Sequence, residues 1–203
     1  MRKIMLIVGA LFVLFMALVL GLWGMSGYNS LITLDQAAQE QWGQVENVYQ
    51  RRADLIPNLV ASVKGAADFE KSTMVEVTEA RAKVGQVTMK SGANPASDPA
   101  ALEKFQQAQD QLSSSLSHLM VVVEKYPDLK ATQGFRDLES QLEGSENRIA
   151  VERMRFNETA QNFNTKRDTF PTVIIAGFFG AKFQQKAYFK AQAGAEKAPQ
   201  VKF

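Results

Sequence analysis

The chain contains no cysteine and a single histidine, His118, in 203 residues. Without cysteine it can form no disulfide, present no thiolate and build no cysteine-containing zinc site. His118 has no second ligand at four-residue spacing, so we interpret it as a surface or boundary residue. The serine run 113–115 has no surrounding glycine elbow and no apparent nucleophilic role. Disulfide, thiol and cysteine/histidine zinc chemistry are thereby excluded, and we expect no catalytic residues.

Net charge is also absent from the body of the chain. The sequence has 23 basic and 21 acidic residues, and Arg2 and Lys3, which precede the first apolar run, account for the difference. Neutralising several phosphates requires a basic stripe with a net positive field. The composition therefore predicts no binding of nucleic acid.

The one long hydrophobic run is Ile4 to Met25, which is 22 residues without a charge. As a helix it would extend for about 33 Å, enough for the roughly 30 Å hydrocarbon core of a bilayer. We interpret residues 1–26 as an uncleaved transmembrane anchor, with cleavage after Ser26 as the alternative. The anchor would contact membrane lipid through residues 4–25.

The residues that flank this run predict its orientation. Two basic residues precede it, whereas the first charges after it are the acidic residues Asp35 and Glu40. The positive-inside rule then places the N-terminus in the cytoplasm and the body outside it, on the periplasmic side of the inner membrane if the cell has two membranes. Trp23 and Tyr28 lie where an interfacial aromatic belt is expected.

The body shows helical periodicity and no alternating strand pattern. Apolar residues three and four apart predict one helix from Leu31 to Val87, bent at Pro57 because proline removes a backbone hydrogen bond. A loop follows at residues 90–98. Asp98 and Pro99 then suit the cap and first turn of a second helix, which Pro127 stops.

The clearest pattern is a repeat of large apolar residues exactly seven positions apart. Such a heptad repeat predicts a left-handed helix-on-helix seam of the coiled-coil type. The second position of the repeat is mixed, so bundle packing is favoured over a simple two-stranded coiled coil. The repeat consists of Phe135, Leu142, Ile149, Phe156, Phe163 and Phe170.

These patterns predict an all-α fold: an N-terminal transmembrane helix followed by an antiparallel up-and-down bundle of three to four long helices. The domains would be the anchor at 1–26, the bundle at 27–171, and an aromatic and basic C-terminal segment and tail at 172–203. The helix expected at 99–125 is too short to cover both the heptad stripe and the apolar stripe at 31–49. We therefore also expect a homo-oligomer.

Two polar motifs interrupt the helices at prolines. The first, residues 51–60, favours a structural interpretation: Arg51 pairs with Asp54 or packs over Leu55, and arginine or asparagine binds the carbonyls exposed at the Pro57 bend. A docking site for partner proteins is the alternative. The second, residues 124–130, is typical of a helix stop and restart. The candidate partner-binding residues are Arg51, Arg52, Asp54, Pro57, Asn58, Tyr126, Asp128 and Lys130.

The C-terminal segment alternates aromatic and lysine residues, which suits an interfacial membrane element. Packing against the bundle is an equal alternative, because the aromatic and basic faces do not separate cleanly. The candidate membrane-interface residues are Trp23, Tyr28, Phe178, Phe179, Phe183, Lys182 and Lys186.

Four glutamates, Glu139, Glu143, Glu146 and Glu152, could suggest a carboxylate metal site in a bundle. The glutamate-x-x-histidine pairs that accompany such sites are missing. We interpret the glutamates as a solvated face paired with Arg148 and Arg153, and we expect neither metal nor cofactor.

Several ordered motifs are similar to those of the bacterial LemA family. They are Tyr28-Asn29, the 51–60 motif, Tyr-Pro-Asp-Leu-Lys-Ala at 126–131, Glu-Asn-Arg-Ile-Ala at 146–150, Phe-Asn at 156–157 and 163–164, and Phe170-Pro171. The resemblance implies a single anchor that carries an antiparallel helical bundle, with no established enzymatic activity. The family includes a protein associated with magnetosome membranes, which implies membrane organisation as one possible role.

Together these features predict a membrane-anchored helical scaffold or adaptor of the bacterial cell envelope. It would bind partner proteins of unknown identity and copies of itself, without catalysis. The alternatives are a membrane-remodelling protein that acts through its C-terminal segment and a non-catalytic accessory subunit of an envelope enzyme.

Overall fold

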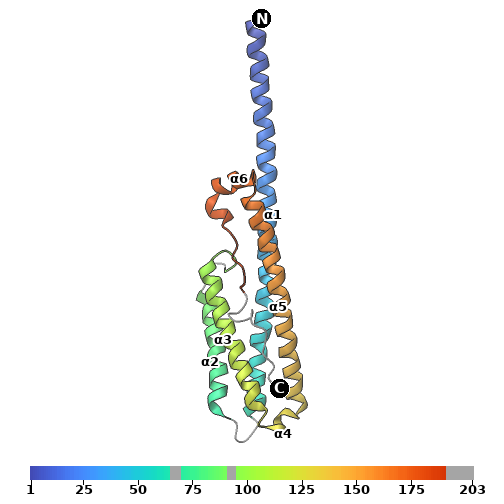
Figure 1. The fold of residues 1–203 in the computed structure, drawn as a ribbon, viewed down its shortest axis with the longest axis vertical. Helices are drawn as coiled ribbons and strands as arrows, with labels where there is room; N and C mark the ends of the chain where they lie inside the picture. Colours follow the sequence, from blue (N-terminus) through green and yellow to red (C-terminus); the bar gives the residue numbers. More distant parts are fainter. Residues whose placement is uncertain (65–69, 91–94, 191–203) are drawn as a thin grey trace, which may run out of the picture.

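The computed structural model describes residues 1–64, 70–90 and 95–190, and its helices form an elongated bundle with one helix projecting far beyond it (Figure 1). No strand occurs in the described residues, so the predicted all-α class is confirmed. The helices are α1 (Arg2–Lys64), α2 (Lys71–Lys90), α3 (Pro99–Val123), α4 (Pro127–Lys130), α5 (Gln133–Asp168) and α6 (Thr172–Phe178), followed by the short 3₁₀ helix η1 (Gly180–Phe183).

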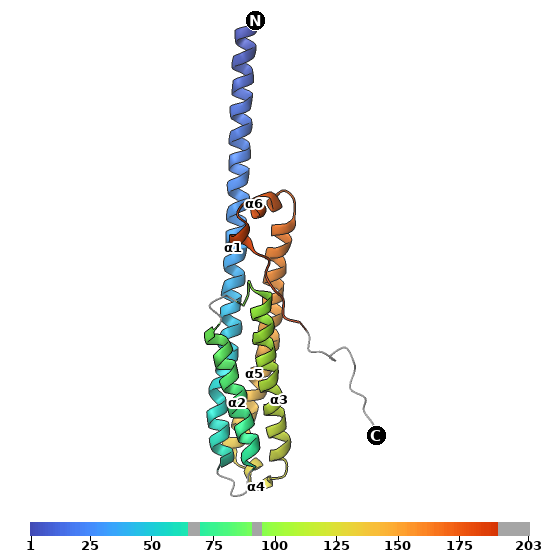
Figure 2. The ribbon, with the colours of Figure 1, turned by 90° about the vertical axis from the view of Figure 1, so that its left-hand side faces the viewer.

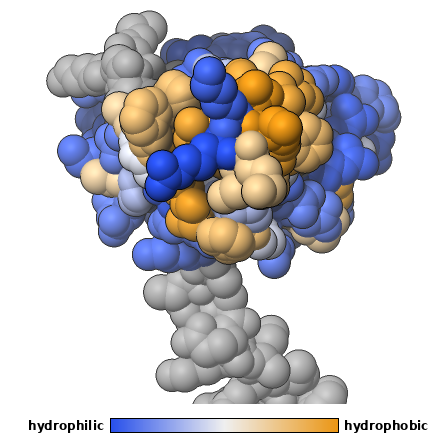
Figure 3. All heavy atoms as spheres, turned by 90° about the horizontal axis from the view of Figure 1, so that it is seen from above, coloured by the Kyte–Doolittle hydropathy of each residue, from blue (hydrophilic) through white to orange (hydrophobic). Residues whose placement is uncertain are grey.

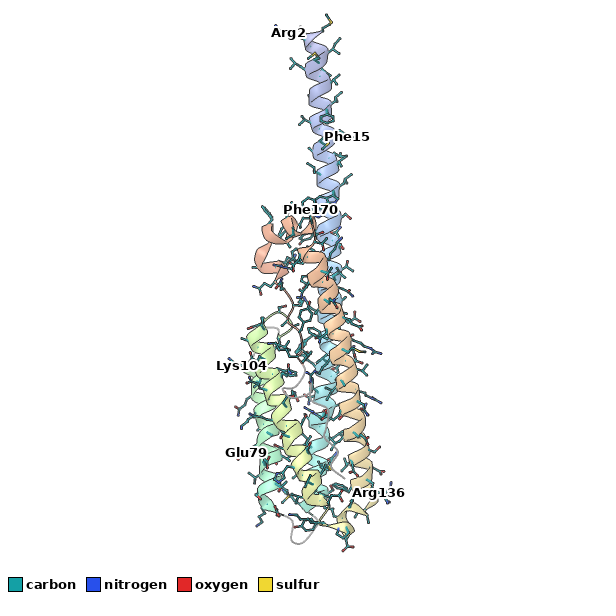
Figure 4. The ribbon with its side chains drawn as sticks, in the orientation of Figure 1. Arg2, Phe15, Glu79, Lys104, Arg136 and Phe170 are labelled. Atoms are coloured by element: carbon teal, nitrogen blue, oxygen red, sulfur yellow. The ribbon has the colours of Figure 1, made fainter. Side chains whose placement is uncertain are left out.

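Helix α1 is a single helix of 63 residues that includes both the apolar run and the first core stripe. The expected boundary between anchor and body, at residues 26 and 27, therefore falls inside a continuous helix. The N-terminal half stands apart from the other helices, and Phe15 projects from it into open space (Figure 4). This stretch is the one described helix that is long and apolar enough to cross a membrane.

Pro57 lies within α1, which continues past it to Lys64. The expected single helix from Leu31 to Val87 is wrong, because the structure has two helices there: α1 ends at Lys64 and α2 begins at Lys71. The apolar spacing continues from one helix to the other and concealed the interruption. Ala66, which the first stripe included, lies outside the described residues.

The remaining helices complete an up-and-down arrangement. α1 and α5 pack side by side along most of the length of α5, while α2 and α3 form a shorter antiparallel pair beside the far half of α1 (Figures 1 and 2). Asp98 caps α3 as expected: its carboxylate accepts hydrogen bonds from the amides of Ala100 and Ala101 at 2.9 and 3.3 Å. Thr132 caps α5 in the same way.

The heptad repeat forms the buried face of α5. Its first five members, from Phe135 to Phe163, are buried, whereas Phe170 is 75% exposed because it lies beyond the end of α5. The expectation for Phe170 is therefore wrong. The five buried members are distributed over three hydrophobic clusters that follow one another along the bundle.

The half of the α5 face nearer the N-terminal apolar helix is covered by the chain's own C-terminal segment. We call this half of the bundle proximal and the other half distal. Phe183 joins Leu31 and Phe163 in one cluster, and Phe189 joins Trp42 and Phe156 in the next. Of the two alternatives for this segment, packing against the bundle thus applies to these residues. The apolar stripe that led us to expect a second copy as cover is already covered within one chain.

The heptad face supplies a test of the packing. Replacing Phe156, which is fully buried, by alanine removes its ring and leaves a cavity, so we expect the free energy of unfolding to fall by about 3 to 5 kcal/mol. Phe170→Ala is the matched control from the same repeat and should change stability by less than about 0.5 kcal/mol. Urea unfolding followed by the fluorescence of the buried Trp42 measures both. Equal effects would contradict the seam.

Candidate functional site: a buried arginine and a bound C-terminal segment

The 51–60 motif is divided between the surface and the core of the bundle. Arg51, Asp54, Pro57 and Asn58 are exposed on the outer face of α1. Arg52, by contrast, is only 1% exposed. Its predicted role in partner binding is wrong, because a guanidinium enclosed by the bundle cannot reach a partner.

Arg52 joins three helices. Its guanidinium donates hydrogen bonds to Ser113 Oγ on α3 at 2.8 Å and to Glu146 Oε1 on α5 at 2.5 Å, and it also bonds the side-chain oxygen of Gln109. Its carbon Cζ lies 5.2 Å from the centre of the Tyr49 ring. These charge-assisted contacts fix the relative positions of α1, α3 and α5 at one level.

Glu146 therefore has a different partner from the one expected. We interpreted it as part of a solvated face paired with Arg148 and Arg153, but it is 46% exposed and forms an ion pair with Arg52. Ser113, which sequence reasoning set aside, acts as an acceptor in the same network. Burial raises the pKa of the nearby Tyr49 phenol, against the opposing effect of Arg153 and Arg52.

The second motif lies at the far end of the bundle, where α3 turns into α5 through α4 (Figure 1). Tyr126 packs against the distal cluster, to which the buried Ile56 and Leu129 belong. Asp128 is exposed. Lys130 pairs with Glu124 at 2.5 Å, and this hydrogen bond raises the pKa of the lysine. Exposed residues of both motifs thus belong to the membrane-distal half.

The candidate membrane-interface residues separate into exposed and buried groups. Phe178 is 84% exposed and Phe179 is also exposed, and Lys182 Nζ lies 2.5 Å from the hydroxyl of Tyr28. Phe183 and Lys186 are buried in the body. Their predicted role at the membrane interface is wrong, because other side chains already enclose them.

Helix α6 packs across α1 just beyond the apolar run. The Tyr28 ring lies 5.0 Å from the ring of Phe179 and 5.5 Å from that of Phe183. The two helices also meet at Gly27, where a Cβ atom would stand 2.6 Å from the end of the Ile175 side chain and would make that side chain move. The contacts of Phe179, which follows α6, and of Phe183 in η1 hold this end of α6 at the level where the predicted membrane span ends.

Residues 184–190 leave η1 as an extended segment that runs along α5, and we call them the extended segment. Lys186 Nζ is bound by Asp35 at 2.5 Å and by Ser97 Oγ at 2.9 Å. The backbone is held by Asn164 and Asn157, whose side chains bond Lys186 and Phe189 respectively. Sequence reasoning missed these two asparagines as binding residues, although the repeated Phe-Asn pairs were visible.

The described residues do not assemble an evident catalytic centre. No group of three or more histidine, aspartate or glutamate side chains within them is placed to hold a metal ion. His118 is half exposed and lies 3.0 Å from Glu76 at the surface. The structure is that of a helical bundle with an N-terminal apolar helix, and its polar networks bind parts of the chain to one another.

Comparison with known proteins gives the family. The model described as the LemA family matches residues 41–203, so the chain belongs to the LemA family, as its motifs suggested. It is 27% identical to the magnetosome protein MamQ of Magnetospirillum gryphiswaldense, in an alignment that covers 80% of this chain and 64% of MamQ. It is 24% identical to the protein LemA of Metamycoplasma hominis, with 81% of this chain and 72% of that protein covered.

A second MamQ protein, MamQ 2 of Paramagnetospirillum magneticum, is 25% identical over 80% of this chain and 64% of its own length. The chain thus spans just under two thirds of the length of the MamQ relatives. The apolar helix and these relatives together identify a membrane-associated protein.

The contribution of the ion pair between Arg52 and Glu146 to stability can be tested by removing the half-exposed carboxylate of Glu146. We expect Glu146→Ala to lower the free energy of unfolding by about 1 to 3 kcal/mol, since it leaves a buried charge without its counter-ion, while water reaching the half-exposed site moderates the loss. Glu143→Ala removes an exposed carboxylate from the same helix and should cost less than about 0.5 kcal/mol.

A double-mutant cycle with Arg52→Met isolates the pair. Because both side chains belong to one network, we expect a coupling energy of about 0.5 to 3 kcal/mol in urea unfolding. Additive effects of the two substitutions would show that the contact contributes no stability of its own.

Proposed function

We propose that the protein is a membrane-anchored helical scaffold that binds partner proteins, and copies of itself, at the bacterial cell envelope without catalysing a reaction. The observation that carries the proposal is the continuity of α1. One helix contains the apolar run from Ile4 to Met25 and then supplies core residues from Leu31 to Val63. A body attached in this way stands at a fixed distance from the bilayer, as a scaffold requires.

The family supports a role at membranes. The MamQ relatives are named as magnetosome proteins. For this chain we propose the topology given by its flanking charges: the N-terminus in the cytoplasm and the body outside it.

The partner surface that we propose is the outer face of α1 in the distal half. Arg51, Asp54 and Asn58 are three and four residues apart, so they lie on one exposed face of the helix. Pro57 deprives the Ala53 carbonyl of its usual amide partner, and Arg81 Nε of α2 donates to that carbonyl at 2.9 Å instead, so the surface is defined by its side chains. Asp128 supplies an acidic residue at the end of the bundle, and Tyr126 and Lys130 are half-buried there.

Site-specific photo-crosslinking tests this surface. With a photoreactive amino acid at Asn58 of the full-length protein, we expect discrete adducts with one or a few envelope proteins in living cells. The same amino acid at Glu79 on the surface of α2, which Figure 4 labels, is the control. Arg51→Glu should reduce the Asn58 adducts severalfold. Equal, diffuse adducts from both positions would contradict a partner site on α1.

A membrane role for α6 is the second candidate, and a specific observation favours it. Phe170, Ile174 and Phe178 are strongly exposed and lie four residues apart, at the end of the body from which the anchor emerges. Phe170 stands at that end in Figure 4, and Figure 3 looks down on the same end with the projecting apolar helix nearest the viewer. We infer that this face rests on the bilayer surface.

One labelling experiment tests both the topology and this contact, because the chain has no native cysteine. Val121→Cys and Ile174→Cys each replace an exposed apolar residue, the first on distal α3 and the second on α6. In intact spheroplasts a membrane-impermeant maleimide should modify position 121 rapidly. It should modify position 174 at least about tenfold more slowly until detergent is added.

The two halves of this result are independent. Protection of position 121 in intact spheroplasts, relieved by lysis, would place the body in the cytoplasm. Equal rates at positions 121 and 174 would contradict the membrane contact of α6 and leave the scaffold proposal in place.

A further inference from the structure

The extended segment is bound mainly through its backbone, by side chains that come from two helices. Asn164 accepts a hydrogen bond from the amide of Lys186 at 2.8 Å and donates one to the carbonyl of Lys186 at 2.9 Å. Asn157 accepts a hydrogen bond from the amide of Phe189 at 2.9 Å and donates one to the carbonyl of Phe189 at 3.0 Å. Gln106 of α3 donates to the carbonyl of Lys190 at 2.8 Å. Each asparagine therefore replaces the hydrogen bonds that a neighbouring β-strand would make.

The spacing of the two asparagines matches the geometry of an extended chain. They are seven residues apart on α5, which is a rise of about 10.5 Å along a helix. Lys186 and Phe189 are three residues apart, which is about 9 to 10 Å in an extended backbone. The segment runs antiparallel to α5, since its later residue binds the earlier asparagine. The repeated Phe-Asn pair thus gives α5 both a buried heptad face and a regular row of backbone-binding amides.

Two side chains of the segment enter formed sites. Lys186 is enclosed by Asp35 and Ser97 and lies with its Nζ 5.0 Å from the centre of the Phe163 ring. The Phe189 ring stacks on Trp42 with centroids 5.9 Å apart, and Arg153 lies over its face at 4.8 Å. Between them, the amide of Ala187 donates to the carbonyl of Ala96 at 3.2 Å. The surface therefore recognises an extended peptide with lysine at one position and an aromatic residue three positions later.

We propose that this surface is a peptide-binding site that also accepts the extended segment of a second copy, so that neighbouring proteins exchange their C-terminal segments. Every copy presents the lysine and phenylalanine that the surface fits, and anchors in one bilayer keep all copies at the same height and at high effective concentration. Residues 169–185 connect α5 to Lys186. This connection contains α6 and η1, which pack on α1, so α6, η1 and the extended segment would pass to the neighbour as one unit with residues 169–171 as the hinge. Three extended residues reach about 10 Å, which is comparable to the distance of about 8 to 10 Å between two packed helices.

This inference rests on the self-association in the proposed function and identifies the site for it. A trans-bound α6, η1 and extended segment would make the same contacts with α1, α3 and the length of α5 as the cis-bound ones, so exchange changes only the packing of α6 against α5 at the hinge. The anchored scaffold would then become a chain or ring of copies without a separate interface. The ligand is thus the segment 184–190 of a neighbouring full-length protein.

Disulfide trapping in the full-length, membrane-anchored protein tests the exchange. Two differently tagged forms are co-expressed, one carrying Ala96→Cys and the other Ala187→Cys, and the membranes are treated with a mild thiol oxidant. These two residues are buried in one hydrophobic cluster and share a backbone hydrogen bond of 3.2 Å, so their backbones lie side by side. We expect a disulfide-linked dimer that carries both tags. Replacing Ala187→Cys by the exposed Asp128→Cys gives the background from collisions.

Substitutions of the two asparagines test whether their hydrogen bonds hold the exchanged segment. Asn157→Asp and Asn164→Asp keep the size of each side chain but lose the donor that binds the segment's carbonyl, so together they should lower the trapped yield about tenfold. Asn162→Asp, an exposed position on the same helix, should leave it unchanged. Equal yields in all three forms would overturn the role of the asparagine pair.

The remaining outcomes test the binding surface and the self-association of copies separately. Ala96→Cys and Ala187→Cys combined in one chain should form an intrachain disulfide, and its absence would overturn the binding surface itself. If the tagged forms co-purify without the mixed disulfide, the exchange is wrong although the copies associate by another surface. If they neither co-purify nor cross-link, both the exchange and the proposed self-association fail.

Discussion

The structure depends on a difference in length between its two pairs of packed helices, because the pair α1 and α5 is longer than the pair α2 and α3. α5 has 36 residues and an apolar face along its buried length, whereas α3 has 25 and α2 has 20. At about 1.5 Å per residue, α5 extends roughly 16 Å beyond the reach of α3. An apolar face of that size cannot remain in water without a large cost in free energy. The C-terminal segment covers it, and the aromatic clusters, the backbone-binding asparagines and the position of α6 all follow from that cover.

Polar residues mark the levels at which this architecture changes. Arg52 ties three helices together in the four-helix part, and the buried contact between Lys186 and Asp35 ties the extended segment to α1 in the proximal part. Apolar contacts alone would tolerate sliding of one helix along another. A buried charge tolerates little displacement, because a small shift leaves it without a partner. These residues therefore specify the register of a bundle whose hydrophobic core specifies only that the helices meet.

The sequence predicts the elements with regular periodicity and misses those without it. The heptad repeat and the Asp98-Pro99 start identify α5 and α3, because helix packing and capping leave local patterns. The end of α1 was missed since the stripe resumes in phase in α2, although Gly65 is of the residue type that commonly follows a helix. Arg52 lies in the stripe that includes Tyr49, Ile56 and Leu59, so its burial could have been predicted from the helical spacing. The binding of the extended segment was not, because seven residues without periodicity do not reveal a surface more than twenty residues away.

The continuity of α1 also makes the anchor and the bundle share one helical phase. A residue inserted between Met25 and Leu31 would rotate the entire body by about 100° around the anchor and move it about 1.5 Å from the bilayer. The face that carries α6 would then turn away from its present direction, and nothing between span and bundle could absorb the rotation. The number of residues between the apolar run and the first core leucine is therefore as much a determinant of orientation as any side chain in the bundle.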